Sequence, residues 1–136
     1  MQVEAAGRRR GDVHIFDITG ALTLGPHLHS FVAQTCSELA MSGSRGAVLN
    51  LGGLTDIDSA GLGGFLSLYA EASRRGCRLV LACAGPRVRE LLKLTHLERV
   101  LPCHDTEEAA VAAARGGTES ARQQFAQAEV PDQPQQ

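Results

Sequence analysis

The sequence has no tryptophan, one tyrosine and four phenylalanines among its 136 residues, so aromatic rings contribute little to its core. The core must instead be built from leucine, valine, isoleucine and alanine. Net charge is also small, at −2. Binding to nucleic acid or to an anionic membrane generally needs clustered lysine and arginine, so the charge balance argues against both partners.

Long apolar runs are missing as well. None approaches the roughly 20 residues that cross a bilayer, and the first residues do not have the basic-then-apolar pattern of a secretion signal. The four cysteines form no C-x-x-C pair, and we expect them to be reduced thiols rather than metal ligands. These features predict a cytoplasmic protein with no metal and no cofactor.

The length fits one domain followed by a tail. Helical and strand periodicity stops near Gly116, and the remaining residues end in a Pro- and Gln-rich segment. Such a composition buries too little apolar surface to order itself. We therefore predict a single domain over residues 1–116 and a flexible tail over residues 117–136.

Apolar periodicity and turn residues predict nine elements within the domain. In chain order they are a short edge strand at 1–5, a strand at 12–19, a helix at 26–41, a strand at 47–51, a helix at 59–75, a strand at 78–83, a helix from Pro86, a strand at 99–101 and a helix at 106–115. Short apolar strands that alternate with helices are typical of an α/β fold with a mainly parallel sheet. The first two strands are expected to form an antiparallel edge, joined by a turn at 7–11 in which Arg8, Arg9 and Arg10 are solvated.

The most informative segment is Asn50–Gly64, which we interpret as the loop from a buried strand into the second long helix. In open α/β sheets the carboxyl ends of the strands are where ligands and partners bind. Asp58 or Ser59 occupies the N-cap, where a side-chain oxygen accepts a free backbone N–H.

Three glycines, Gly61, Gly63 and Gly64, occupy the start of this helix. Each costs roughly 0.8–1 kcal/mol of helix propensity relative to alanine. A segment that only had to form a helix would not be expected to contain them. Their bare backbone either admits another chain or allows the helix to pack tightly on its own sheet, and the sequence leaves both interpretations open.

Two other interpretations of this segment fail because residues that their motifs require are missing. A phosphate-binding loop needs a lysine followed by serine or threonine after its glycines, and here Asp56 and Asp58 would repel phosphate. The nucleophile elbow of hydrolases, G-x-S-x-G, needs glycine where this sequence has Ile57. We therefore expect a binding module rather than an enzyme.

The segment from Asp58 to Gly63, Asp-Ser-Ala-Gly-Leu-Gly, resembles the signature loop of STAS domains of the anti-sigma factor antagonist type. Further similarities are Gly20-Ala-Leu-Thr23 before the first long helix, Gly76–Cys83, and Val88–Thr95. Together they extend over roughly residues 3–114, and the combination is specific although each motif alone is loose.

The resemblance implies a STAS fold and a partner-switching role. In that family an anti-sigma factor, itself a serine kinase that binds ATP, binds the antagonist and releases its sigma factor. The kinase then phosphorylates the serine of the Asp-Ser pair, which ends the interaction, and a serine phosphatase reverses this. By resemblance, Ser59 is the phosphoacceptor and Asp58 orients its hydroxyl or contacts the kinase. The implied partner-binding residues are Asp56, Asp58, Ser59, Ala60, Gly61, Leu62, Gly63, Gly64 and, from the earlier loop, Thr23.

Ala60 departs from the family pattern, because many members have serine or threonine there; Ser59 is thus the sole acceptor in the loop. A phosphate on Ser59 would add about −1.5 to −2 charge. The helix dipole favours that charge while Asp56 and Asp58 oppose it, so the consequence should fall on the interface rather than on the fold. Two alternatives remain. One is a STAS module of another assembly, such as a stress-signalling complex or lipid transporter, without Ser59 phosphorylation. The other is a nucleotide-binding or catalytic domain, against which the missing lysine and phosphate cradle argue. The sequence predicts either a monomer or a weak homodimer.

Overall fold

A computed structural model describes residues 2–115, and the predicted tail lies outside the described residues. Its elements are β1 (Glu4–Arg10), β2 (Val13–Leu22), α1 (Pro26–Ser42), β3 (Gly46–Ile57), α2 (Ser59–Arg74), β4 (Arg78–Ala82), α3 (Pro86–Leu94), β5 (Cys103–His104) and α4 (Glu107–Arg115). The predicted order of elements is confirmed.

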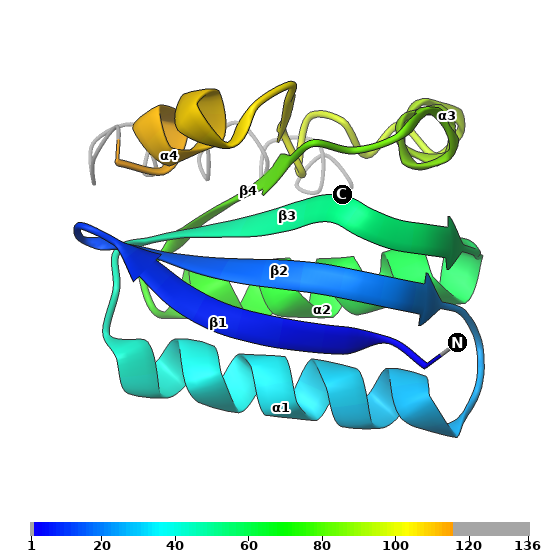
Figure 1. Ribbon diagram of the computed structural model, residues 1–136, viewed down its shortest axis with the longest axis horizontal. Coiled ribbons are helices and arrows are strands. Elements are labelled where there is room, and N and C mark those ends of the chain that lie inside the picture. The colour runs from blue at the N-terminus through cyan, green and yellow to red at the C-terminus, as the bar shows by residue number, and fades with distance from the viewer. Residues whose placement is uncertain (1, 116–136) are drawn as a thin grey trace, which may run out of the picture.

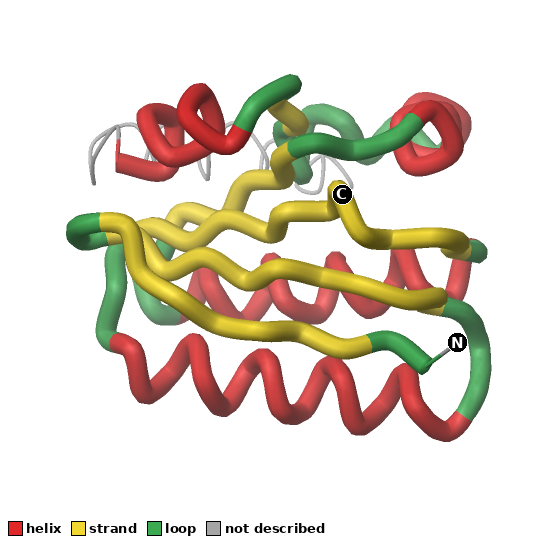
Figure 2. The backbone as a smooth tube through the Cα atoms, viewed as in Figure 1, coloured by secondary structure: helices red, strands yellow, loops and turns green. Residues whose placement is uncertain are grey.

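The strands form one sheet in the order β1-β2-β3-β4-β5. β1 pairs antiparallel with β2, whereas the other three pairings are parallel, as predicted. α1 and α2 cover one face of the sheet and α4 covers part of the other (Figure 1). The tube view shows the same arrangement, with the chain passing from β2 to α1 and from β3 to α2 at one end of the sheet (Figure 2).

Two cores lie on opposite faces of the sheet. The larger joins β2, β3 and β4 to α1, α2 and α3 and includes Phe16, Phe31 and Phe65. The smaller lies under α4 and is built from short side chains such as Val48, Val80 and Ala110. Leucine is the commonest residue of the larger core, and valine and alanine are the commonest of the smaller, as the scarcity of aromatics required.

β3 is longer than predicted. The segment from Gly52 to Ile57 was expected to be a loop, but it continues the strand because it pairs with β2 as far as Leu22↔Ile57. Two register shifts accommodate this pairing. Gly53 contributes to it, because a Cβ there would lie 2.7 Å from Thr19 Cγ2. Pairing between distant segments thus outweighs the local turn preference of glycine, threonine and aspartate.

Two further predictions were wrong. The last strand is Cys103–His104 rather than 99–101, because the pairing of Leu81 with Cys103 sets its register. β1 runs to Arg10 rather than stopping at Ala5, so the three arginines belong to the strand and not to a solvated turn.

Arg8 and Arg10 join β1 to α4 through Glu107. Arg8 donates to Asp17 Oδ2 at 2.6 Å and to Glu107 Oε1 at 2.5 Å, and Arg10 reaches Glu107 Oε2 at 2.9 Å. Asn50 of β3 is a third residue that donates to Glu107, at 2.9 Å. The hydrogen bond from Arg8 is the main cause that lowers the pKa of Glu107 to about 2. The cluster therefore fixes the start of α4 to three strands.

We expect Glu107→Gln to lower the free energy of unfolding by about 1–2 kcal/mol at neutral pH. The expected loss is kept this small because Arg8 is half-exposed and solvent screens its ion pair with Glu107. Because the folded pKa lies below the unfolded value of roughly 4.3, this contribution is present above that value and is lost as pH falls toward 2. Denaturant titrations of both proteins at several pH values would measure it. Equal stabilities at pH 7 would contradict the stabilising role of the cluster, and Glu108→Gln, one residue along α4, is the control.

Candidate functional site

Asp58 begins α2 and connects it to the loop after β2. It is the N-cap, in an extended conformation, and its Oδ1 accepts the backbone N–H of Gly61 at 2.9 Å. Its Oδ2 accepts the backbone N–H of Leu24 at 3.0 Å. These bonds, first Leu24 and then Gly61, lower the pKa of the Asp58 carboxyl. Of the two predicted capping residues, Asp58 is the N-cap. Its carboxylate holds together the start of α2 and the loop at Leu24.

Ser59 is the first residue of α2, and it is exposed. It follows directly on the cap, so its hydroxyl lies at the end of the helix where free backbone N–H groups create a partial positive charge. The hydroxyl is therefore accessible to a second protein, at a position where a negative charge is compatible with the helix.

The three glycines at the start of α2 have different reasons to be glycine. A Cβ on Gly61 would overlap the carbonyl oxygen of Leu22 in β2, and a Cβ on Gly64 would lie 3.1 Å from Leu28 of α1. Gly63 has nothing within 4 Å of that position. Tight packing explains Gly61 and Gly64, while Gly63 is the glycine that leaves bare backbone open to another molecule.

The loop between β2 and α1 lies beside Ser59, held there by Asp58. Thr23 is half-buried in it, whereas the side chain of Leu24 is 78% exposed. Leu24 therefore places one exposed apolar side chain beside the serine. The sequence analysis did not identify Leu24. The one feature of the sequence that could have indicated it is its position next to Thr23 in the predicted loop.

Asp56 and Arg87 lie close to the start of α2, because Arg87 reaches the backbone of Ile57. Arg87 Nε is 3.9 Å from Asp56 Oδ1 and donates to the carbonyl of Ile57 at 3.3 Å. Both side chains are largely exposed. Arg87, at the start of α3, was also missed in the sequence analysis, and it offsets part of the negative charge of Asp56.

The structure divides the predicted partner-binding set in two. Asp56, Asp58, Ser59, Ala60, Gly63 and Thr23 are exposed or half-buried around the start of α2. Gly61, Leu62 and Gly64 are buried. Gly61 and Gly64 pack against β2, β3 and α1 and so shape the site from inside. Leu62 lies in the larger core. Contact of these three residues with a partner stays a prediction.

Within residues 2–115 no cluster of histidine, cysteine and carboxylate side chains could hold a metal ion, and no helix there is long and apolar enough to cross a membrane. The four cysteines are free thiols, and burial raises the pKa of Cys77 to about 11. A thiol with a raised pKa is a poor nucleophile at neutral pH.

The mainly parallel sheet, its antiparallel edge strand and the capped helix define a small α/β domain. The STAS domain family model matches residues 5–110, and the chain belongs to this family. Three solved structures illustrate the likeness.

A Thermotoga maritima protein proposed to be an anti-sigma factor antagonist is 25% identical, with a TM-score of 0.73 over 82% of this chain and 94% of that one. The Bacillus cell fate determinant SpoIIAA, solved in its phosphorylated form, is 19% identical, with a TM-score of 0.57 over 82% of this chain and 97% of that one. A sulfate transporter family protein from Wolinella succinogenes is 18% identical, with a TM-score of 0.57 over 76% and 85%. The last two are likenesses of fold.

Proposed function

We propose that this protein is an anti-sigma factor antagonist that binds an anti-sigma factor serine kinase and is switched off by phosphorylation of Ser59. The observation that carries the proposal is the exposed serine at the first position of α2, directly after a cap that holds the neighbouring loop in place. The similarity to an anti-sigma factor antagonist candidate at 25% identity supports it.

The residues around Ser59 suit a protein partner. Leu24 offers an exposed apolar side chain, and Gly63 offers open backbone one helical turn after the serine. Asp58 is already committed to two backbone N–H groups, so we assign it the task of fixing the shape of the site. We infer that the partner covers Leu24, Ser59 and Gly63 together.

The charge of a phosphate explains how the switch would work. At the start of α2 the helix dipole stabilises the added charge by about 0.3–1 kcal/mol, and repulsion from Asp56 is reduced by Arg87. The fold should therefore change little. At an interface, a desolvated double charge costs several kcal/mol.

The test is incubation with ATP and a serine kinase of the anti-sigma factor type, followed by intact mass measurement and site mapping. We expect the addition of one phosphate, located on Ser59 and absent in Ser59→Ala. Ser67, a second exposed serine on α2, is the internal control and should stay unmodified. Stable binding to such a kinase without any phosphorylation would instead favour a STAS module that serves another assembly.

A further inference from the structure

The outer edge of β1 is open. β1 lies at the end of the sheet, and among the strands of residues 2–115 only β2 pairs with it (Figure 1). Five of its seven residues are exposed. The free N–H and C=O groups of an edge strand form a template for pairing with another chain.

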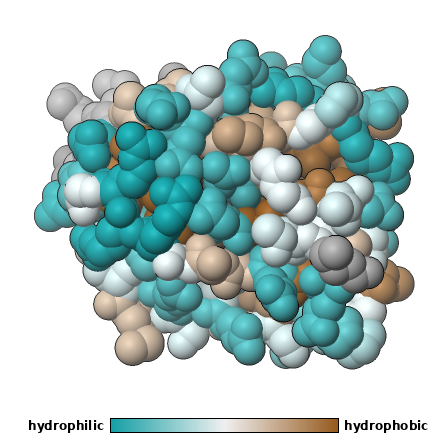
Figure 3. Space-filling model, in the orientation of Figure 1, coloured by the Kyte–Doolittle hydropathy of each residue, from teal (hydrophilic) through white to brown (hydrophobic). Residues whose placement is uncertain are grey.

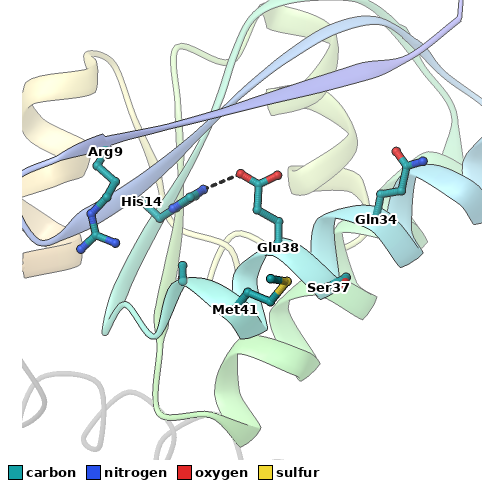
Figure 4. Close-up of a pocket in the computed structure, with 7 residues that line it drawn as sticks. Arg9, His14, Gln34, Ser37, Glu38 and Met41 are labelled. Atoms are coloured by element: carbon teal, nitrogen blue, oxygen red, sulfur yellow. Dashed lines mark hydrogen bonds and ion pairs between the residues drawn. The ribbon is translucent and has the colours of Figure 1, made fainter.

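A groove follows this edge between β1 and α1. Two cavities of about 460 and 110 Å³ lie along it, and both are lined by Gln34 and Glu38 of α1. The close-up of the larger one shows Arg9 of β1 and Met41 of α1 at its rim, with His14 bonded to Glu38 across it (Figure 4). The side chain of Met41 is 84% exposed. Methionine and arginine are enriched at protein–protein contacts.

The charges along β1 are complementary to those of a second β1. The strand reads Glu4-Ala-Ala-Gly-Arg-Arg-Arg10, acidic at one end, basic at the other and small in the middle. The surface view shows hydrophilic side chains gathered toward the basic end (Figure 3). Parallel pairing in register would place arginine against arginine, which is unfavourable. Antiparallel pairing centred on Gly7 places Glu4 of each copy opposite Arg10 of the other, so that one ion pair can form at each end of the strand pair.

We propose that two copies of this chain pair antiparallel through their β1 strands, making one continuous sheet with Glu4 beside Arg10 of the second copy. Alternation along a strand supports the match, because residues six apart face the same side. Arg10 faces α4, where it bonds Glu107, so Glu4 faces that side too.

In this arrangement the two-fold axis passes beside Gly7, at the centre of the strand. Gly7 lies against the Glu38 carboxylate, which is 2.8 Å from His14 Nε2. Two such carboxylates would approach each other across the axis. Arg9 faces the same side as Gly7 and would lie diagonally opposite Gly7 of the second copy. Each copy thus supplies a cation toward the other's Glu38.

The contact is small. A seven-residue strand pair is about 24 Å long, and stable complexes bury about 800 Å² per partner. We therefore expect a weak dimer, with a dissociation constant of roughly 10–1,000 µM. It would leave the Ser59 site free, since that site lies at the start of α2 rather than on β1.

Sedimentation velocity over a concentration series up to about 1 mM tests the proposal. The wild type should shift from monomer to dimer, Glu4→Arg should weaken association at least about tenfold, and Glu98→Arg, the same change at another exposed glutamate, should leave it unchanged. Glu4→Arg mixed with Arg10→Glu should associate again, because the mixed pair restores both ion pairs.

Arg10→Glu also places a carboxylate near Glu107, so this variant could change the fold as well as the dimer contact. Amide hydrogen exchange of the wild type avoids this problem because it needs no variant. Protection of amides in residues 4–10 should rise with protein concentration. A wild type that stays monomeric throughout, or a dimer indifferent to Glu4→Arg and without added protection of β1, would overturn the proposal.

Discussion

Gly61→Ala is expected to destabilise the protein by about 3 kcal/mol, because its new methyl group would overlap backbone rather than a movable side chain. The overlapping atom is the carbonyl oxygen of Leu22, and Ile57 Cγ1 would lie 3.0 Å from the added Cβ. Leu22 and Ile57 are paired in the sheet, so neither can retreat without disturbing β2 and β3. Thermal unfolding should shift downward by about 10 °C or more.

Gly63→Ala is the matched control, two residues along the same helix. Nothing lies within 4 Å of its added Cβ, and alanine is the better helix former, so we expect a gain of about 0.5–1 kcal/mol. The same substitution should weaken partner binding if the partner contacts this backbone. Similar stability losses in both variants would contradict the assignment of Gly61 to packing and Gly63 to binding.

Ser59→Glu is expected to reduce affinity for the anti-sigma factor by about 100-fold or more, which corresponds to roughly 3 kcal/mol. The glutamate places a negative charge at the exposed first position of α2, where it would be desolvated in the complex. Its stability should stay within about 0.5 kcal/mol of the wild type, because a carboxylate suits a helix N-terminus.

Calorimetric titration and thermal unfolding of the same sample would separate the two effects. Ser59→Ala should bind like the wild type, which shows that the charge and not the lost hydroxyl is responsible. Ser67→Glu, at an exposed position two turns further along α2, should have little effect. Unchanged affinity for Ser59→Glu would mean that the partner does not cover this residue.

Local signals predicted the long helices closely. α1 and α2 match the predicted ranges to within a residue at each end, because an apolar face, a proline or capping residue at the start and a glycine after the end all act locally. β3 and β5 were misjudged because their limits depend on pairing with β2 and β4. Nothing in the local sequence of Gly52 or Gly53 indicates a strand.

The same distinction holds at the site. The Asp58–Ser59 pair was identifiable because the cap and the glycines are adjacent in sequence. The bond from Leu24 to Asp58 joins residues 34 positions apart, and the bond from Arg87 to Ile57 joins residues 30 apart. Which glycine packs inward and which stays open also depends on neighbours such as Leu22 and Leu28, which only the fold brings near.

The most direct test of the central claim is displacement of a sigma factor from its anti-sigma factor by this protein. A preformed complex of the two would be titrated with the unphosphorylated chain and, separately, with the chain phosphorylated on Ser59, and free sigma factor would be measured. We predict release by the unphosphorylated form, and release by the phosphorylated form only at about 100-fold higher concentration or above. Equal release by both forms would contradict Ser59 as the switch, and release by neither would contradict the proposed antagonist role.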